Sequence, residues 1–317
     1  MPSYSGIWTL SQQFQAVGQG LWPPNFVPPE TFAIFALGRT CGFTPLTTRN
    51  KYTYAGCVVS TGGAATAASQ AGSAAGNSIV GIFALGDAPS ASTTRNKYTY
   101  SSDVVSAGGA ATVASNYGSA TGNSTVGIFA LGQAPSASTT RDKYTYSGCV
   151  VSAGSAATAA SAQGSAAGNS TVGIFALGFV AGAGSTTRNK YTYSGDVVSA
   201  GGASTAASQC NSAVGNSTVG IFALGATPTV VTTRDKYTYS GDVVSAGGAA
   251  TIASYGGSAA GNGTAGIFAL GGNASFAPTI TRNKYTYSGC VVTAATAATT
   301  ASQQGSAASN GTSGVNI

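Results

Sequence analysis

Six near-identical units follow one another along this chain of 317 residues. The string FALG begins at Phe35, Phe83, Phe129, Phe175, Phe222 and Phe268. A second string, R-[ND]-K-Y-T-Y, begins at Arg49, Arg95, Arg141, Arg188, Arg234 and Arg282, and a third, close to SAAGN, ends at Asn77, Asn123, Asn169, Asn216, Asn262 and Asn310. Each string recurs every 46 to 48 residues, which leaves room for four short strands and their turns.

Each unit is predicted to form four strands, A to D. The small-residue run around GSAAGN predicts strand A, and GNST is suited to the tight turn after it. TVGIFALG, rich in β-branched and aromatic residues, predicts strand B. After a variable loop, TRNKYTY predicts strand C, with both tyrosines on one face and Arg, Lys and Thr on the other. A short turn then leads to strand D, DVVSAGG.

The two ends of the repeat complement each other. The first unit starts at strand B, around residues 30–36, and the last unit leaves a surplus strand A at residues 305–310. The C-terminal strand is therefore expected to complete the first blade and to close the ring, which removes exposed sheet edges. We predict an all-β, six-bladed β-propeller over residues 30–317, preceded by a short N-terminal arm at residues 1–29.

The order of the strands resembles kelch repeats, in which a small-residue strand precedes an aromatic strand ending in Gly-Gly and a Tyr-bearing strand follows. GSAAGN, GIFALG and TRNKYTY stand in those places over about residues 31–317. A full Gly-Gly follows strand B at Gly271-Gly272, and strand D lacks the family's late Trp. The resemblance implies a kelch-like propeller that binds through the face carrying the B–C and D–A loops.

Composition argues against catalysis. The chain has no His and only seven acidic residues, although His is the commonest general acid/base near neutral pH. A polysaccharide-degrading enzyme needs clustered carboxylates, and they are scattered over Glu30, Asp87, Asp103, Asp142, Asp196, Asp235 and Asp242. We expect no enzyme, cofactor or metal site. The formal charge is +6, but without a Lys/Arg run we expect no nucleic-acid partner, and without a long apolar stretch no membrane insertion.

Variation between the units is predicted to gather on one face. In an antiparallel blade the A–B and C–D turns share one rim, where the units are nearly uniform, and the B–C and D–A loops share the other, where they differ. We predict that the second face binds a ligand. The candidate residues are Arg39, Phe43, Asp87, Asn116, Tyr117, Gln133, Gln163, Phe179, Gln209, Tyr255, Asn273, Phe276 and Gln303. The alternative is that these loops vary because nothing constrains them.

Twelve of the thirteen basic residues open the six C strands as Arg-x-Lys pairs. They predict a positive girdle able to attract an anionic polysaccharide or a negatively charged surface. The alternative is a structural role, as caps of strand edges or as hydrogen bonds between blades. The pairs are Arg49/Lys51, Arg95/Lys97, Arg141/Lys143, Arg188/Lys190, Arg234/Lys236 and Arg282/Lys284.

Five cysteines, an odd number without CxxC spacing, indicate neither a zinc site nor a complete disulfide framework. Cys57, Cys149 and Cys290 take the position that Asp103, Asp196 and Asp242 hold in the other units. Units 6 and 1 are neighbours in a closed ring, so Cys57–Cys290 is the same-position pair to test as a disulfide. The N-x-T triplets are interpreted as turns, not as glycosylation sites.

Residues 1–29 lie outside the repeat and are predicted to form a docking arm. Leu10, Phe14 and Val17 have helical spacing, and both tryptophans, Trp8 and Trp22, lie here. The alternative is that the arm covers its own propeller. The string SGIWTLSQQFQAVGQGLWP is similar to segments of tail-fibre and other structural proteins of tailed bacteriophages, especially phages of cyanobacteria and marine bacteria. That resemblance implies a virion location, on the tail or capsid.

The leading hypothesis is therefore a non-enzymatic phage virion protein, a tail fibre or adhesin-like receptor-binding protein. The arm would contact other virion proteins, and one propeller face would bind a host surface glycan, with homo-oligomers in the particle as a further expectation. A purely structural adaptor or decoration protein is the second hypothesis. A polysaccharide-degrading enzyme is the third.

Overall fold

The computed structural model describes residues 31–133 and 136–311. By their contacts the residues divide into two units, Met1–Glu30 and Thr31–Ile317. The predicted arm residues Trp8, Leu10, Phe14 and Trp22 lie outside the described residues. Within the described ranges no helix is long and apolar enough to cross a membrane.

The second unit is built from six four-stranded antiparallel sheets, here called blades 1 to 6. Blade 1 contains β29 (Ser306–Ser309), β1 (Phe32–Ala36), β2 (Arg49–Thr53) and β3 (Val58–Gly62). Blade 2 contains β4 (Ser73–Gly76), β5 (Val80–Ala84), β6 (Arg95–Thr99) and β7 (Val104–Ala107). Blade 3 contains β8 (Ser119–Gly122), β9 (Val126–Ala130), β10 (Arg141–Thr145) and β11 (Val150–Gly154).

Blades 4 to 6 repeat this order. Blade 4 contains β13 (Ser165–Gly168), β14 (Val172–Ala176), β17 (Arg188–Thr192) and β18 (Val197–Ala200). Blade 5 contains β19 (Ser212–Gly215), β20 (Val219–Ala223), β21 (Arg234–Thr238) and β22 (Val243–Ala246). Blade 6 contains β24 (Ser258–Gly261), β25 (Ala265–Ala269), β27 (Arg282–Thr286) and β28 (Val291–Ala295).

The remaining elements are short and lie in the connections. The loops carry β12 (Ser161–Ala162), β15 (Phe179–Val180), β16 (Ala183–Gly184), β23 (Ser254–Tyr255) and β26 (Gly272–Asn273). Three C–D turns form the 3₁₀ turns η1 (Ser147–Cys149), η2 (Ser240–Asp242) and η3 (Ser288–Cys290). In the A–B turns, Asn123 Oδ1 accepts hydrogen bonds from the backbone N–H groups of Thr125 and Val126 at 2.9 Å. The N-x-T triplet thus forms the turn that the sequence predicts.

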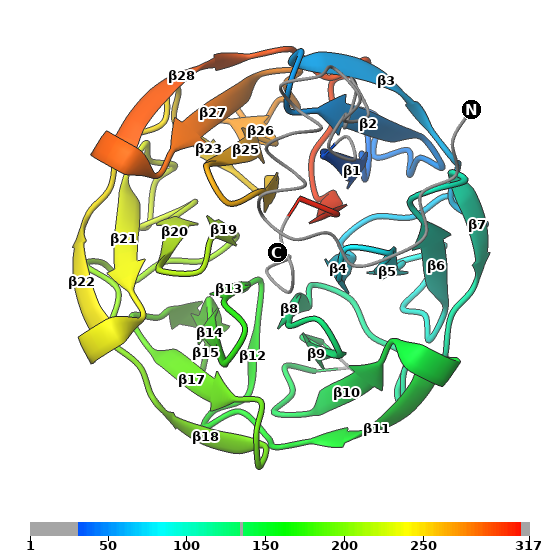
Figure 1. Ribbon diagram of the computed structural model, residues 1–317. Coiled ribbons are helices and arrows are strands. Elements are labelled where there is room, and N and C mark those ends of the chain that lie inside the picture. Colours follow the sequence, from blue (N-terminus) through cyan, green and yellow to red (C-terminus); the bar gives the residue numbers. More distant parts are fainter. Residues whose placement is uncertain (1–30, 134–135, 312–317) are drawn as a thin grey trace, which may run out of the picture. The chain divides into compact units, whose positions relative to one another are not determined.

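The blades surround a common axis (Figure 1). The A strands β4, β8, β13, β19, β24 and β29 contact one another in cyclic order, so that β29 lies between β24 and β4. These strands approach closely: a Cβ added to Gly261 of β24 would lie 2.7 Å from Val214 Cγ2 of β19. The crowding explains why strand A carries small residues, and the predicted β-propeller fold is confirmed.

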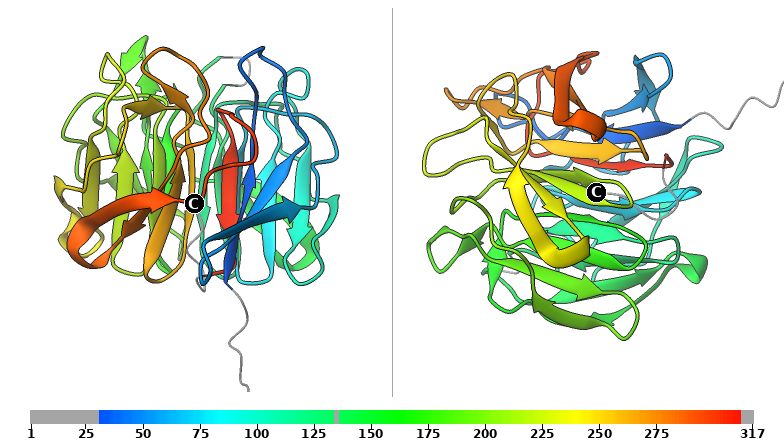
Figure 2. Two further views of the ribbon diagram at one scale, coloured as in Figure 1. Left: turned by 90° about the horizontal axis from the view of Figure 1, so that it is seen from above. Right: turned by 60° about the vertical axis from the view of Figure 1, so that its left-hand side comes forward.

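The ring closes where its two ends meet. β29 pairs with β1 in antiparallel register, from Ala33↔Ser309 to Ala36↔Ser306, and Figure 2 shows the two strands side by side. The backbone N–H of Phe32 donates to Asn310 Oδ1 at 2.7 Å. The prediction that the C-terminal strand completes the first blade is therefore confirmed.

Aromatic rings and arginines fill the space between blades. Arg49 of blade 1 lies over the ring of Phe83 of blade 2, 4.5 Å from its centroid, and donates through Nη2 to Asn96 Oδ1 at 3.1 Å. Equivalent Arg–Phe stacks occur at all six junctions. Tyr98, fully buried, packs at the same junction. Because the guanidinium groups sit on aromatic faces inside the fold, they bind blade to blade.

Twelve buried tyrosines, two from each C strand, make stability sensitive to alkali. Burial raises the pKa of all twelve above the ordinary value, to about 12 for Tyr144 and Tyr191. Unfolded tyrosines ionise near pH ~10, so this stability is fully present below that pH and is lost above it. Burial also lowers the pKa of the six arginines, to about 10 for Arg49, Arg141, Arg234 and Arg282. This shift makes the folding stability rise with pH, opposite to the effect of the tyrosines.

Because the twelve tyrosines outnumber the six arginines, we expect cooperative unfolding between roughly pH 10 and 12, each tyrosine costing about 1.4 kcal/mol per pH unit. The tyrosinate absorbance of the twelve buried tyrosines and the circular dichroism, followed together in an alkaline titration, should change in one step. Three of the fifteen tyrosines do not belong to these twelve, namely Tyr4, Tyr117 and Tyr255. Ionisation of more than three tyrosines with the circular dichroism unchanged would contradict the expectation.

Candidate functional site

The two faces of the ring differ as the sequence predicts. The A–B and C–D turns lie on one, here called the uniform face, and the B–C and D–A loops lie on the other, the variable face. Contacts between B–C and D–A loops show that these loops share one face: Gln70 pairs with Asp87, Asn116 with Gln133 and Arg39 with Gln303. β1 begins, and β29 ends, on the uniform face, so both ends of the described ring lie opposite the variable face.

The D–A loops join in a ring of backbone hydrogen bonds at the axis. The amide of Ala71 donates to the Gln304 carbonyl at 2.8 Å, and the amide of Tyr117 donates to the Ala71 carbonyl at 2.8 Å. The remaining members of this ring are Gln163 N to Tyr117 O, Asn211 N to Gln163 O, Gly256 N to Cys210 O and Gln304 N to Gly256 O. All six blades therefore contribute to the mouth around the axis.

A pocket with a cavity volume of about 100 Å³ lies within this mouth and opens to solvent. Each blade contributes one stretch of four residues to its wall, namely 71–74, 117–120, 163–166, 210–213, 256–259 and 304–307. The wall contains no charged side chain. Burial raises the pKa of the Cys210 thiol to about 11, so this group is also neutral at physiological pH. The site therefore favours an uncharged ligand.

Serine hydroxyls form the inner part of the wall, at the first residue of each strand A. They belong to Ser73, Ser119, Ser165, Ser212, Ser258 and Ser306. Ser165 Oγ is buried without a hydrogen-bond partner in the described part of the chain. A hydroxyl with spare hydrogen-bonding capacity suits a ligand that itself carries hydroxyl groups.

Residues that differ between blades surround the mouth. Gln304 Nε2 donates to Tyr117 OH at 3.5 Å, and the Cys210 thiol donates to Gln163 Oε1 at 3.2 Å, whereas blade 2 carries the small Ala71 at this position. All these residues adopt a left-handed backbone, with φ from 51° to 56°. The opening is thus polar and asymmetric, although its scaffold is nearly sixfold.

An aromatic cluster lies on the same face, at the B–C loops of blades 1 and 6. Phe43 and Phe276 are 68% and 69% exposed. The guanidinium of Arg39 lies 4.5 Å from the Phe43 ring centroid, and the rings of Tyr255 and Phe276 meet edge to face at 5.4 Å. With its amide oriented to satisfy its neighbours, Gln303 donates to Tyr255 OH at 2.9 Å and accepts from Arg39.

The other predicted candidates pair with residues of neighbouring loops on the variable face. Asn116 Nδ2 donates to Asp87 Oδ1 at 2.7 Å. Phe179 pairs with Ala162 across β15 and β12, and Asn273 pairs with Ser254 across β26 and β23. Gln209 bridges to Ala226. The variation between units predicts Tyr117 and Gln163 as site residues and places Cys210 and Gln304 in the same variable loops, but it does not reveal the serines of the pocket wall.

No protein-family model matches the chain, and no curated protein matches it either. Among solved structures it is similar to the one titled "Structure of YjhT". The TM-score is 0.60 at 10% sequence identity, over 75% of this chain and 86% of that chain. At this identity the similarity supports the fold alone, and it agrees with the β-propeller architecture.

The prediction that the six arginines form an exposed positive girdle is wrong. Arg49, Arg95, Arg141, Arg188, Arg234 and Arg282 are at most 1% exposed. Each donates to an Asn or Asp side chain of the next blade, as Arg95 does to Asp142 at 2.8 Å. The lysines are half-buried, and three of them, Lys51, Lys143 and Lys190, are paired with aspartates of the next blade. Hydrogen bonding between blades, the structural alternative, explains the repeat.

Cys57 and Cys290 do not form a disulfide, because all five cysteines are free. In the described ranges no three His, Cys, Asp or Glu side chains gather as metal ligands would.

The uniform face has a hydrophobic feature that the sequence pattern did not reveal. The first valine of strand D is 52–58% exposed in every blade, immediately after the C–D turn. These residues are Val58, Val104, Val150, Val197, Val243 and Val291.

Proposed function

We propose that this protein is a non-enzymatic carbohydrate-binding β-propeller that recognises a neutral glycan of a host surface through its variable face. The observation that supports this most strongly is the uncharged axial pocket, with hydroxyl and amide groups on its wall and one tyrosine at its mouth. A sugar offers hydroxyl donors and acceptors to such groups. Its apolar ring face suits the electron-rich face of an aromatic side chain.

The aromatic cluster of Arg39, Phe43, Tyr255 and Phe276 provides a second contact on the same face. Large exposed aromatic side chains are typical of binding surfaces. A glycan longer than one or two sugars would enter the pocket with its end and lie across these rings. Anionic polysaccharides are disfavoured in this proposal, because the arginines of the expected girdle are buried between the blades.

The described carboxylates support a binding role over a hydrolytic one. Asp142 and Asp235 are buried in ion pairs with arginines, and Asp103, Asp196 and Asp242 are paired with lysines. Asp87 accepts a hydrogen bond from Asn116. Each therefore already serves a structural contact, whereas a glycosidase needs two carboxyl groups facing the same bond.

The particle context belongs to the proposal as well. We assign the protein to the virion of a tailed phage, attached through residues 1–29, on the strength of the resemblance carried by residues 5–23. β1 begins on the uniform face, which is opposite the proposed binding face.

A glycan array probed with the full chain tests this function. We expect binding to neutral oligosaccharides, with little change when the salt concentration is raised, because the site uses no ion pairs. Binding confined to sulfated or uronic-acid glycans and abolished by salt would contradict it.

A structural adaptor or decoration protein is the second candidate, and the six exposed valines of the uniform face favour it. A regularly spaced apolar ring suits a contact with another particle protein. A map of the particle separates the two candidates. The adaptor role requires the variable face to be covered by another virion protein, and receptor binding requires it to be open.

A further inference from the structure

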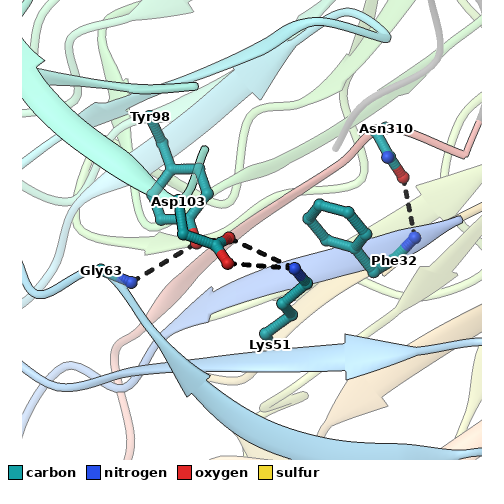
Figure 3. A network of polar contacts seen from close by, with 6 residues as sticks. All are labelled: Phe32, Lys51, Gly63, Tyr98, Asp103 and Asn310. Carbon is teal, nitrogen blue, oxygen red and sulfur yellow. Dashed lines mark hydrogen bonds and ion pairs between the residues drawn. The ribbon is translucent and has the colours of Figure 1, made fainter. Parts of the chain in front are cut away.

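Three blade junctions contain the same ion pair. Lys51 Nζ lies 3.1 Å from Asp103 Oδ2, and the Lys143–Asp196 and Lys190–Asp242 pairs measure 2.8 Å and 3.0 Å. Each aspartate also accepts a hydrogen bond from a tyrosine of its own blade, as from Tyr98 OH at 2.5 Å. Figure 3 shows this arrangement around Asp103. The carboxylate thus sits between an ammonium group and a phenol hydroxyl.

Cysteine replaces aspartate at the other three junctions, on the same backbone. Cys57, Cys149 and Cys290 have φ of 51°, 54° and 55°, and the three aspartates have 53°. The approach of the preceding blade is also equal. A Cβ on Gly109 would lie 2.3 Å from the Cys149 carbonyl oxygen, and a Cβ on Gly202 would lie 2.3 Å from that of Asp242. Ser155 and Thr296 replace this glycine at one junction of each kind, so the one consistent difference between the two kinds is the Asp or Cys side chain.

The surroundings of these thiols match those of the aspartates. Tyr52, Tyr144 and Tyr285 precede these cysteines by five residues and are fully buried, at the positions that Tyr98, Tyr191 and Tyr237 hold before the aspartates. By the repeat, the lysines that face them from the preceding blades are Lys284, Lys97 and Lys236. Within residues 31–133 and 136–311 these three lysines form no ion pair. By the repeat, each of these junctions brings together a thiol, a buried tyrosine and a lysine without an ion pair.

We propose that Cys57, Cys149 and Cys290 are oxidation sites, at which a peroxide converts each thiol to a sulfinate that forms the missing ion pair with the lysine. The sulfinate resembles the aspartate carboxylate in its charge, its two oxygens and its single methylene link to the backbone. The lysine and the tyrosine then stabilise the negative oxygens. Oxidation would thus strengthen the propeller at three junctions, and this proposal does not depend on glycan binding.

The chemistry needs hydrogen peroxide or an organic hydroperoxide as the oxidant. The sulfur attacks the O–O bond of a first peroxide, which gives a sulfenic acid and, from hydrogen peroxide, one water. A second peroxide adds another oxygen and releases a second water. The sulfur is oxidised in both steps, each peroxide is reduced, and the sulfinic acid loses its proton to solvent.

The test uses the full chain carrying Cys41→Ser, which removes the exposed thiol of a loop. Hydrogen peroxide treatment, followed by peptide mass spectrometry, should show two added oxygens on Cys57, Cys149 and Cys290 ahead of Cys210. The thermal midpoint should rise by about 1–4 °C for each oxidised junction. Unmodified thiols at the three junctions, or an unchanged or lowered midpoint after their oxidation, would overturn the proposal.

Two variant pairs make the result independent of peroxide damage elsewhere. Cys149→Asp should raise the midpoint without oxidant, whereas Cys149→Asn, equal in shape but uncharged, should not. Lys97→Gln should remove the gain given by Cys149→Asp. A gain that persists in Lys97→Gln, or that Cys149→Asn gives equally, excludes the ion pair as its cause.

Discussion

A chain that ends at residue 304 is expected to lose most of its folding stability, because blade 1 is then left without its innermost strand. β29 supplies the ladder partner of β1 from Ala33 to Ala36. It also stands between β24 and β4 at the axis. Without it the backbone groups of one edge of β1 are exposed, and the buried side chains of Ile34 and Phe35 lose part of their cover.

The expected loss is comparable with the whole stability of a domain. Re-exposing two large apolar side chains costs about 3–6 kcal/mol, against a total that is typically about 5–15 kcal/mol. Urea unfolding followed by circular dichroism measures the effect. A chain ending at Gly311 is the matched control, since it keeps every described contact of β29, and it should unfold at the same urea concentration as the full chain.

Complementation makes this prediction specific to the strand. A synthetic peptide of residues 305–317, added to the chain that ends at residue 304, should restore stability in proportion to its concentration by adding as a strand. A truncated chain as stable as the full one would show that the ring does not depend on closure by β29.

Arg95→Met is expected to destabilise the protein by about 3–5 kcal/mol, because it leaves the carboxylate of Asp142 buried without its cation. Both side chains are fully buried, and the Nη2–Oδ2 distance is 2.8 Å. Asp142 retains hydrogen bonds from Thr112, but these donors are neutral. Urea unfolding of the variant measures the loss.

The repeat provides the matched control. Arg141 has the same stack on Phe175 but donates to the neutral Asn189 at 3.1 Å, so Arg141→Met should cost about 1–3 kcal/mol. The double variant Arg95→Met/Asp142→Asn should recover stability relative to Arg95→Met alone. Equal losses in Arg95→Met and Arg141→Met would mean that the charge of Asp142 contributes nothing.

The repeat allows most of the fold to be predicted. The missing strand before Phe32 and the surplus strand after Gln304 indicate the closure, and antiparallel alternation assigns the loops to their faces. These inferences succeed because strand period and chain connectivity follow directly from the order of residues. They need no knowledge of which side chains become buried.

Burial is the property that the sequence leaves undetermined. The charge of Arg49 and its equivalents predicts a surface position, whereas the neighbouring blade covers them. One signal is present: the residue after each of these arginines is always Asn or Asp, a hydrogen-bond acceptor. The pocket escapes prediction for a related reason. Its serines belong to strands of six different blades, and only the closed ring brings them to one axis.

Binding of a neutral glycan to paired face variants tests the central claim most directly. Blade 2 already has an alanine, Ala71, at the position of Tyr117, with the same left-handed backbone. The fold should therefore tolerate Tyr117→Ala. Val104→Thr changes an exposed residue of the uniform face. With the glycan found on the array, calorimetry should show affinity reduced about tenfold or more by Tyr117→Ala and unchanged by Val104→Thr. Unchanged affinity in Tyr117→Ala together with lost affinity in Val104→Thr would place binding on the opposite face and contradict the account.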